Sequence, residues 1–411
     1  MCCEIALYPK LDDGRSGFSV CNLTEINGGK STSKKKFFEQ CQAAAILGTL
    51  QAGYTDFRFL NEESHQIIEE EALIGVGITG WMNNPKILFD KSNMVEGAEV
   101  VKATNRVIAG LIGIRPSARC TTVKPSGSSS VLLETTSGIH GEHSKKYIRH
   151  VQFNKDTEIA QAFKKYNPDM IEDSVWSTNK TDICVAFPVV SPKDSIFKSD
   201  LLGVKQLEYV KLAQQYWIER GTNVELCKKP YLRHNVSNTI TVDDWDEVIG
   251  YVYDNREYLT GVSFLAAAGD KAYPQSPFTE IIDMADIISK YGQVSLFTSG
   301  LVEAGLNAFN DDLWMACNTA LGQGLDLSTS GHANILRRDF VRRFEKFASN
   351  FSSKEECADC LKDVYLLHKW WRIQKRGKMI DFTSELSKKE YTDINTLGAQ
   401  ACAGGVCEIT W

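Results

Sequence analysis

The stretch RCTTVKPSGSSS, residues 119–130, is the clearest sign of the fold class. It opens with a β-branched run typical of a buried strand and continues into a loop of proline, serine and glycine. Further stretches with helical periodicity and β-prone runs lie before and after it. The expected helices are 33–51, 62–74, 95–112, 204–219, 245–255, 279–289 and 354–376, and the expected strands are 119–123, 183–187 and 236–242. This alternation predicts an α/β fold.

Bulk composition excludes several classes of protein. The 411 residues carry a formal net charge of −6, which disfavours binding to duplex nucleic acid. No apolar run approaches the roughly 18 residues that span a bilayer, and the N-terminus lacks the layout of a signal peptide. We therefore expect a cytoplasmic protein without a membrane contact. In that compartment, 12 cysteines suggest catalytic or redox use rather than a disulfide scaffold.

The loop after the expected strand 119–123 is a candidate phosphate site. Glycine allows close approach of the backbone to a ligand, hydroxyls donate hydrogen bonds, and exposed N–H groups favour anions. The candidate residues are Pro125, Ser126, Gly127, Ser128, Ser129 and Ser130. The loop lacks the spacing of a P-loop, and a plain serine–glycine loop is the alternative interpretation.

The N-terminus places two cysteines beside a carboxylate. In an extended segment, Cys2 and Glu4 point to the same side. A neighbouring carboxylate disfavours a thiolate but suits a neutral thiol that exchanges hydrogen atoms. An ordinary terminal segment is the alternative. Cys21, taken alone, is typical of a buried cysteine in a strand.

Other cysteine pairs differ in their expected roles. Cys402 and Cys407 are separated by four small residues in a stretch unlike a core element, so they could close a disulfide in a mobile tail. Cys357 and Cys360 form a C-x-x-C without a second pair, so we expect them to pack on one face of a helix rather than to bind zinc.

Several of these motifs, in this order, resemble the ribonucleotide reductases. Cys2-Cys3-Glu4-Ile5 is similar to the family's radical loop, which implies that Cys2 carries the thiyl radical and Glu4 is the base. CNLTEI resembles the segment of an active-site cysteine, which makes Cys21 a thiol oxidised during turnover. TTVKPSGSSSVLLETTSGIHGEHSKKYIRHV looks like the family's phosphate-binding segment, and the Cys402–Cys407 pair like its re-reducing tail.

The likeness is to the adenosylcobalamin-dependent subgroup that reduces ribonucleoside triphosphates. RHNVSNTITV and GVSFLAAAGDKAYPQSPF resemble segments of that subgroup. The chain has no adjacent tyrosines, whereas the iron-dependent class uses such a pair in its radical relay. The resemblance implies adenosylcobalamin as the cofactor, with contacts at Val262, Ser263, Phe264, Leu265, Tyr273 and Pro274.

The resemblance also implies an incomplete catalytic unit. The family fold is a ten-stranded α/β barrel, and this chain would supply its C-terminal half, with residues 1–390 as barrel and cobalamin-binding segments and 391–411 as a mobile redox tail. Cys3 replaces a glycine, Ser128 a threonine and Met1 a proline of the family pattern. An asparagine, a partner cysteine and the effector region would precede position 1. We expect an N-terminal half from a split gene or an intein-joined precursor.

The implied reaction removes the 2′-hydroxyl of a ribonucleotide as water. Cys2 takes the 3′ hydrogen, Glu4 takes the 3′-hydroxyl proton, and Cys21 with its missing partner supplies two electrons. Cys402 and Cys407 then reduce the resulting disulfide, and a thioredoxin-like protein reduces them in turn. The alternatives are an inactive fragment and a thiol–disulfide exchange protein that uses the tail pair alone.

Overall fold

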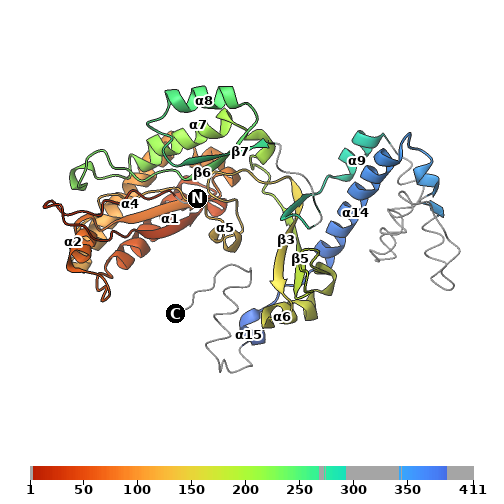
Figure 1. Cartoon of the computed structure of the whole chain (residues 1–411), viewed down its shortest axis with the longest axis horizontal. Coiled ribbons are helices and arrows are strands. Elements are labelled where there is room, and N and C mark those ends of the chain that lie inside the picture. Colours follow the sequence, from red (N-terminus) through yellow and green to blue (C-terminus); the bar gives the residue numbers. More distant parts are fainter. Residues whose placement is uncertain (1–2, 268–272, 274, 293–341, 344, 387–411) are drawn as a thin grey trace. The chain divides into compact units, whose positions relative to one another are not determined.

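The computed structural model describes residues 3–267, 273, 275–292, 342–343 and 345–386. The chain divides into two compact units, which are described separately (Figure 1). The first comprises Met1–His143 and Ser191–Lys271, and the second Ser144–Val190 and Ala272–Trp411.

The first unit contains five neighbouring parallel strand segments within its described residues. β1 (Asn22–Asn27) pairs with β2 (Ile74–Thr79), and β6 (Asn238–Val242) pairs with β7 (Val262–Ala266). The expected strand 119–123 joins the two pairs, because it bridges Val76 on one side and Val236 on the other. The backbone N–H of Val76 donates to the Cys120 carbonyl over 2.8 Å. The order is therefore β1, β2, 119–123, β6 and β7.

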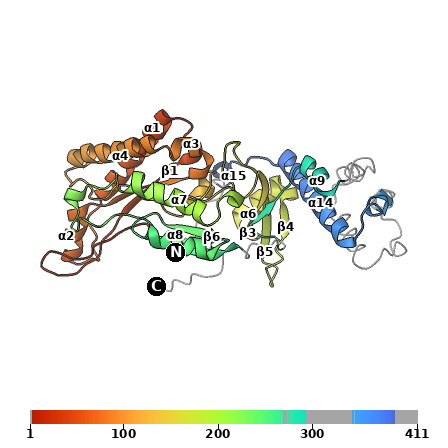
Figure 2. The ribbon, with the colours of Figure 1, turned by 90° about the horizontal axis from the view of Figure 1, so that it is seen from above.

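Helices accompany these strands, as the α/β pattern predicts. The longest are α1 (Lys34–Ala52) and α4 (Lys91–Ile112), which lie side by side (Figures 1 and 2). The Ser33 hydroxyl caps α1, and α4 ends at Gly113, which has a φ of 76°. The shorter helices are α2 (Glu62–Glu71), α3 (Pro85–Leu88), α5 (Ser129–Leu132), α7 (Val204–Ala213), which continues as a π-helical turn at Gln214–Ile218, and α8 (Trp245–Asp254). Single 3-10 turns occupy Gly28–Lys30, Trp81–Asn83, Lys198–Asp200 and Val224–Leu226.

The core of the first unit fills the space between strands and helices. Phe37 of α1, Val76 of β2 and Trp217 of the π-helical turn are completely buried. The indole N–H of Trp217 donates to the Thr122 carbonyl over 3.1 Å, which ties the turn to the central strand. The two-layer arrangement holds the strand ends, where the candidate site lies.

The second unit is built on an antiparallel sheet. Its order is β4 (Ile171–Asp173), β5 (Asp182–Val190), β3 (Lys146–Asn154) and β8 (Phe278–Glu280). Its helices are α6 (Glu158–Tyr166), α9 (Met284–Tyr291), α14 (Lys354–Arg376) and α15 (Phe382–Leu386), with a 3-10 turn at Pro168–Met170. Cys357 and Cys360 are buried on α14, in agreement with a packing role.

Two expected helices were too long. The segment 62–74 ends as a helix at Glu71, because Ile74 begins β2 and donates to the Arg119 carbonyl. The segment 279–289 begins as a strand, because Thr279 pairs with Ile148 of β3, and α9 starts only at Met284. The other expected helices and strands are confirmed to within a few residues. No helix in the described ranges combines the length and apolar character needed to cross a membrane.

Candidate active site

Residues 3–6 lie along two strand segments of the first unit. The backbone N–H of Cys3 donates to the Ser237 hydroxyl over 3.2 Å. The Glu4 carbonyl accepts two hydrogen bonds of 2.8 Å, from the Thr122 hydroxyl and from the Asn235 backbone N–H. The Asn235 side chain donates to the Cys3 carbonyl over 2.9 Å. Each of these bonds links residues more than 100 positions apart, so the tertiary fold holds this segment in place.

The Glu4 side chain is the clearest chemical feature of this segment. It is only 7% exposed, and its Oε2 atom has no hydrogen-bond partner among the described residues. A buried carboxylate oxygen without a partner costs free energy. Such an atom suits a ligand hydroxyl or a transferable proton.

Cys21 lies immediately before β1 and next to Gly75 of β2. A methyl group in place of the Gly75 hydrogen would lie 3.3 Å from its sulfur, so the thiol fills the space that glycine leaves. Burial raises the pKa of the Cys21 thiol, and the charge of Glu4 adds to the shift. Burial thus keeps this thiol neutral, and the joint role of Cys21 and Glu4 stays a prediction.

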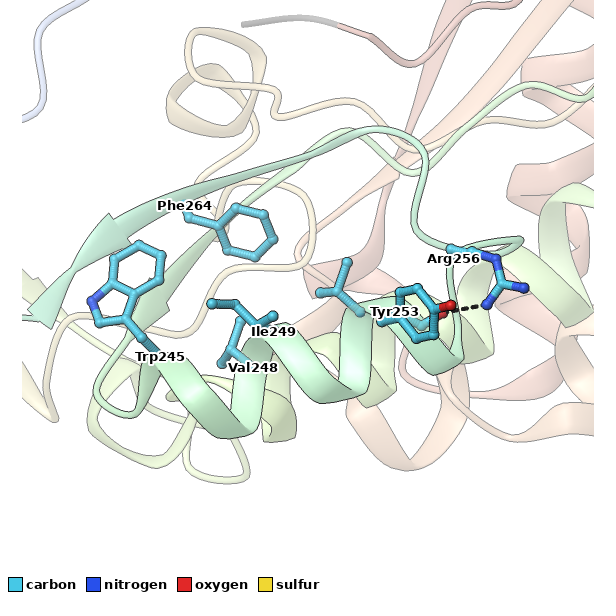
Figure 3. A pocket seen from close by; sticks show the side chains of 7 residues that line it. Trp245, Val248, Ile249, Tyr253, Arg256 and Phe264 are labelled. Atoms are coloured by element: carbon cyan, nitrogen blue, oxygen red, sulfur yellow. Dashed lines mark hydrogen bonds between the residues drawn. The ribbon is translucent and has the colours of Figure 1, made fainter.

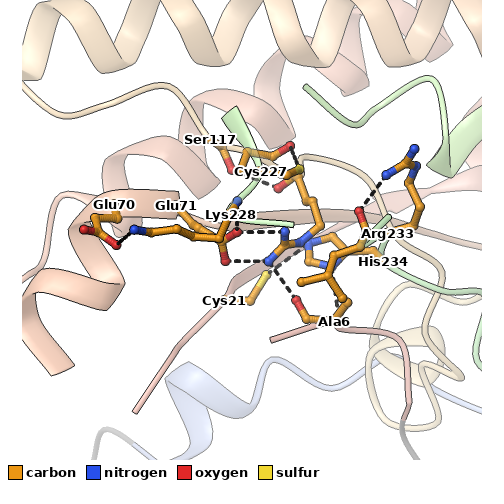
Figure 4. A network of polar contacts seen from close by, with 12 residues as sticks. Ala6, Cys21, Glu70, Glu71, Ser117, Cys227, Lys228, Arg233 and His234 are labelled. Carbon is orange, nitrogen blue, oxygen red and sulfur yellow. Dashed lines mark hydrogen bonds and ion pairs between the residues drawn. The ribbon is translucent and has the colours of Figure 1, made fainter. Parts of the chain in front are cut away.

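A network of polar side chains lies around Cys21 (Figure 4). The Arg119 guanidinium donates to both carboxylate oxygens of Glu71, over 3.0 and 2.6 Å, and to the Ala6 carbonyl over 3.0 Å. The His234 ring contacts Ala6 on one edge and Cys21 on the other. Arg119, Glu71 and His234 were not selected from the sequence, although His234 lies in the segment RHNVSNTITV. In the sequence, the only feature that these three residues share is that they lie in β-prone or helical runs.

The expected phosphate loop is directed toward a carboxylate of the protein itself. Ser126 and Ser129 both donate their hydroxyls to Glu25 of β1, the latter over 2.9 Å. Lys124 completes the cluster, with its Nζ 3.0 Å from Oε2 of the same side chain. α5 is too short to offer an anion site at its N-terminus. The phosphate role of Pro125–Ser130 therefore stays a prediction, and Glu25, part of the CNLTEI motif, is a functional candidate that sequence reasoning passed over.

The expected cobalamin contacts are divided between the two units, and one of them lies outside the described residues. Val262–Leu265 lie on β7, Tyr273 belongs to the second unit, and Pro274 lies outside the described residues. Phe264 lines an apolar pocket of about 360 Å³ with side chains of α8 (Figure 3). Its other lining residues are Trp245, Val248, Ile249, Val252, Tyr253 and Arg256. The pocket is too small to enclose a corrinoid. Because Leu265 is 61% exposed, the apolar surface beside the pocket suits contact with one edge of a corrinoid.

Three further expected residues lie outside the described ranges. These are Cys2, the expected radical site, and the tail pair Cys402 and Cys407. Among the described residues, no group of three or more histidine, cysteine, aspartate or glutamate side chains could hold a metal ion.

Comparisons with known proteins identify relatives of this chain in sequence and in fold. The chain is 26% identical over 280 residues to an adenosylcobalamin-dependent ribonucleoside-triphosphate reductase of Euglena gracilis, a match that covers 66% of this chain and 36% of the relative. It is 22% identical over 299 residues to a probable enzyme of the same name from Dictyostelium discoideum, covering 70% of this chain and 36% of the relative. No family model matches the chain.

A solved structure shows the same likeness. The crystal structure of a B12-dependent (class II) ribonucleotide reductase aligns with a TM-score of 0.52 and 20% identity, over 65% of this chain and 39% of that one. The chain thus has the α/β fold of a class II ribonucleotide reductase. Its resemblance in sequence to the adenosylcobalamin-dependent ribonucleoside-triphosphate reductases is confirmed. The matches span less than half the length of these relatives.

Proposed function

We propose that this chain is the C-terminal part of an adenosylcobalamin-dependent ribonucleotide reductase that acts on ribonucleoside triphosphates. The observation that carries the proposal is the buried Glu4 carboxylate, whose Oε2 has no partner among the described residues, beside the neutral thiol of Cys21. The names of the relatives support the substrate class and the cofactor.

The described residues suit two steps of this reaction. Glu4 would accept the 3′-hydroxyl proton of a bound ribonucleotide, and its buried Oε2, which has no hydrogen-bond partner among the described residues, supports this role. Cys21 and a second cysteine would together give two electrons and two protons, close a disulfide and release the 2′-hydroxyl as water. A neutral thiol suits this role, because its hydrogen supplies one of the two protons and its sulfur forms the disulfide.

Residues outside the described ranges would complete the cycle. Adenosylcobalamin, when bound, supplies the radical that converts Cys2 to a thiyl. Cys402 and Cys407 would exchange with the active-site disulfide and pass the oxidation to a thioredoxin-like reductant. Pro125–Ser130 would hold the substrate phosphates.

The structure also supports an additional polypeptide that completes a ten-stranded barrel. Within the described residues, β7 pairs only with β6, and an exposed strand edge is an open template for further pairing. Trp245, Ile249 and Leu265 are exposed on the neighbouring surface of α8 and β7. An N-terminal half of the reductase would cover this surface and supply the missing cysteine.

Co-expression with a reductase N-terminal half tests the function. The complex should reduce a ribonucleoside triphosphate only with adenosylcobalamin and a dithiol. Glu4→Gln should abolish turnover while far-UV circular dichroism stays unchanged, and Glu39→Gln, on the exposed face of α1, is the matched control. Reduction by the purified chain alone would contradict the need for a second polypeptide. Dithiol exchange that survives Cys2→Ala but not Cys407→Ala, without nucleotide reduction, would contradict the reductase proposal.

A further inference from the structure

The His234 ring joins two parts of the candidate active site. Its Nδ1 atom lies 3.2 Å from the backbone N–H of Ala6, two residues beyond Glu4. Its Nε2 atom lies 3.2 Å from the Ile74 carbonyl and 3.8 Å from the Cys21 sulfur. The ring is completely buried. A single rigid side chain therefore spans from the segment that carries Glu4 to the thiol of Cys21.

The surroundings determine the protonation state of this ring. Burial, and to a smaller extent the positive charge of Arg119, lower the pKa of His234 to about 3. His234 is therefore neutral near pH 7. Because Nδ1 accepts from the Ala6 N–H, the ring proton belongs on Nε2, where it faces the Ile74 carbonyl and the Cys21 sulfur.

With this assignment the single Nε2 proton is shared between the Ile74 carbonyl at 3.2 Å and the Cys21 sulfur at 3.8 Å, so the sulfur can act only as an acceptor toward this ring. A neutral thiol next to an N–H donor cannot direct its own hydrogen to that nitrogen, so the S–H bond of Cys21 points elsewhere. Arg119 adds a second constraint, because it holds the Ala6 carbonyl while His234 holds the Ala6 N–H. Both sides of residue 6 are thus anchored to groups that contact or flank Cys21.

We propose that His234 is a positioning residue that sets the orientation of the Cys21 thiol relative to Glu4. The role in catalysis rests on the reductase function proposed above. The positioning itself is a property of the folded chain and does not depend on that function.

A pair of substitutions separates the two contacts of the ring. His234→Gln keeps a donor close to the position of Nε2 and loses the acceptor for the Ala6 N–H. His234→Asn keeps a polar atom near the position of Nδ1 and loses the donor to Cys21. His65→Gln is the control, because the His65 ring contacts the Phe57 carbonyl and lies outside this network.

The readout is the alkylation rate of Cys21 in the full-length chain, followed by mass spectrometry of its peptide. We expect His234→Asn to lower this rate about fivefold, the equivalent of one lost hydrogen bond, because an N–H donor to the sulfur favours the reactive thiolate. His234→Gln and His65→Gln should leave the rate within about twofold. Equal rates in His234→Asn and wild type would overturn the proposal. If the expected rates are found but the complex with an N-terminal half reduces no nucleotide, the reductase function fails and the positioning role stands.

A measurement on the wild-type chain covers the case in which the variants do not fold. Nitrogen-15 spectra of histidine-labelled protein should show one ring that stays neutral with its proton on Nε2 from pH 5 to 8. If all seven histidines titrate near pH 6.5, or if the buried ring carries its proton on Nδ1, the proposal is wrong.

Discussion

Arg119 and Glu71 form a two-pronged ion pair with nitrogen–oxygen distances of 3.0 and 2.6 Å, and both side chains are almost completely buried. Arg119 uses the same guanidinium to hold the Ala6 carbonyl. The pair therefore links the end of α2 to the segment that carries Glu4. Its partners lie 48 positions apart in the sequence, and the ion pair forms only because β2 and the strand 119–123 run side by side.

Removing one partner of this pair should destabilise the chain strongly. Glu71→Ala leaves the Arg119 charge buried without its counter-ion, which we expect to lower the free energy of unfolding by about 3–5 kcal/mol. Urea denaturation followed by circular dichroism measures the loss. Glu70→Gln is the control, because Glu70 pairs with Lys228 at a partly exposed site and should cost under about 1 kcal/mol. Equal losses in the two variants would contradict this assignment.

Replacing Gly75 should disturb the Cys21 environment. A methyl group there would lie 2.6 Å from Leu23 Cδ2 and 3.3 Å from the Cys21 sulfur, so neighbouring side chains must shift. We expect Gly75→Ala to lower the free energy of unfolding by about 1–3 kcal/mol.

Gly110→Ala is the control for this substitution, because here the added methyl group should stabilise the chain. Apart from the neighbouring residues and the backbone of α4 itself, no described atom lies within 4 Å of a methyl group added at this position, and alanine is the better helix former. We expect Gly110→Ala to raise the free energy of unfolding by about 0.5–1 kcal/mol, measured in the same urea titration. A larger loss at Gly110 than at Gly75 would show that the packing around Cys21 is loose.

The charge of Glu25 should weaken anion binding at the serine-rich loop. At an effective dielectric constant of about 20, two unit charges roughly 6 Å apart repel by about 3 kcal/mol, more than the ~1 kcal/mol of one hydrogen bond to a serine hydroxyl. Glu25→Gln also frees Lys124 from its ion pair. We therefore expect Glu25→Gln to bind tripolyphosphate more tightly than wild type in isothermal titration calorimetry. Weaker binding would instead identify Glu25 as the anchor that shapes the loop, and Glu39→Gln should change nothing.

The buried His234 should make the chain sensitive to acid. Its pKa is about 3 in the folded chain and near 6.5 when unfolded, so between these values the unfolded chain binds more protons. The free energy of unfolding therefore falls as pH is lowered below 6.5, by an order of 2–3 kcal/mol at pH 4.5 for this group. Urea midpoints at pH 7 and 4.5 measure the fall. His234→Gln should lose that much less stability than wild type, and an identical pH dependence would show that His234 titrates normally.

The sequence by itself determined most of the longer helices and the motifs, but the strands β2, β3 and β7 were not among the expected elements. The helical periodicity of residues 95–112 and the glycine at 113 predict α4, because apolar spacing and a left-handed C-terminal residue are local properties. The resemblance at CNLTEI and at the serine-rich loop indicated Cys21 and Ser126 as site residues, and the structure joins both motifs through Glu25. The strand β8, at three residues, carries no periodic signal and was missed.

Only the tertiary structure decided which groups share the site. His234 contacts Ala6 from 228 positions away, and Thr122 contacts Glu4 from 118. Such pairs depend on the order of the parallel strands, which hydrophobic patterning within each strand does not specify. The neutral state of His234 likewise follows from its complete burial beside Arg119. Glu4 and Cys21 could be proposed from the sequence motifs, whereas Arg119, Glu71 and His234 emerged only from the long-range packing that surrounds Cys21.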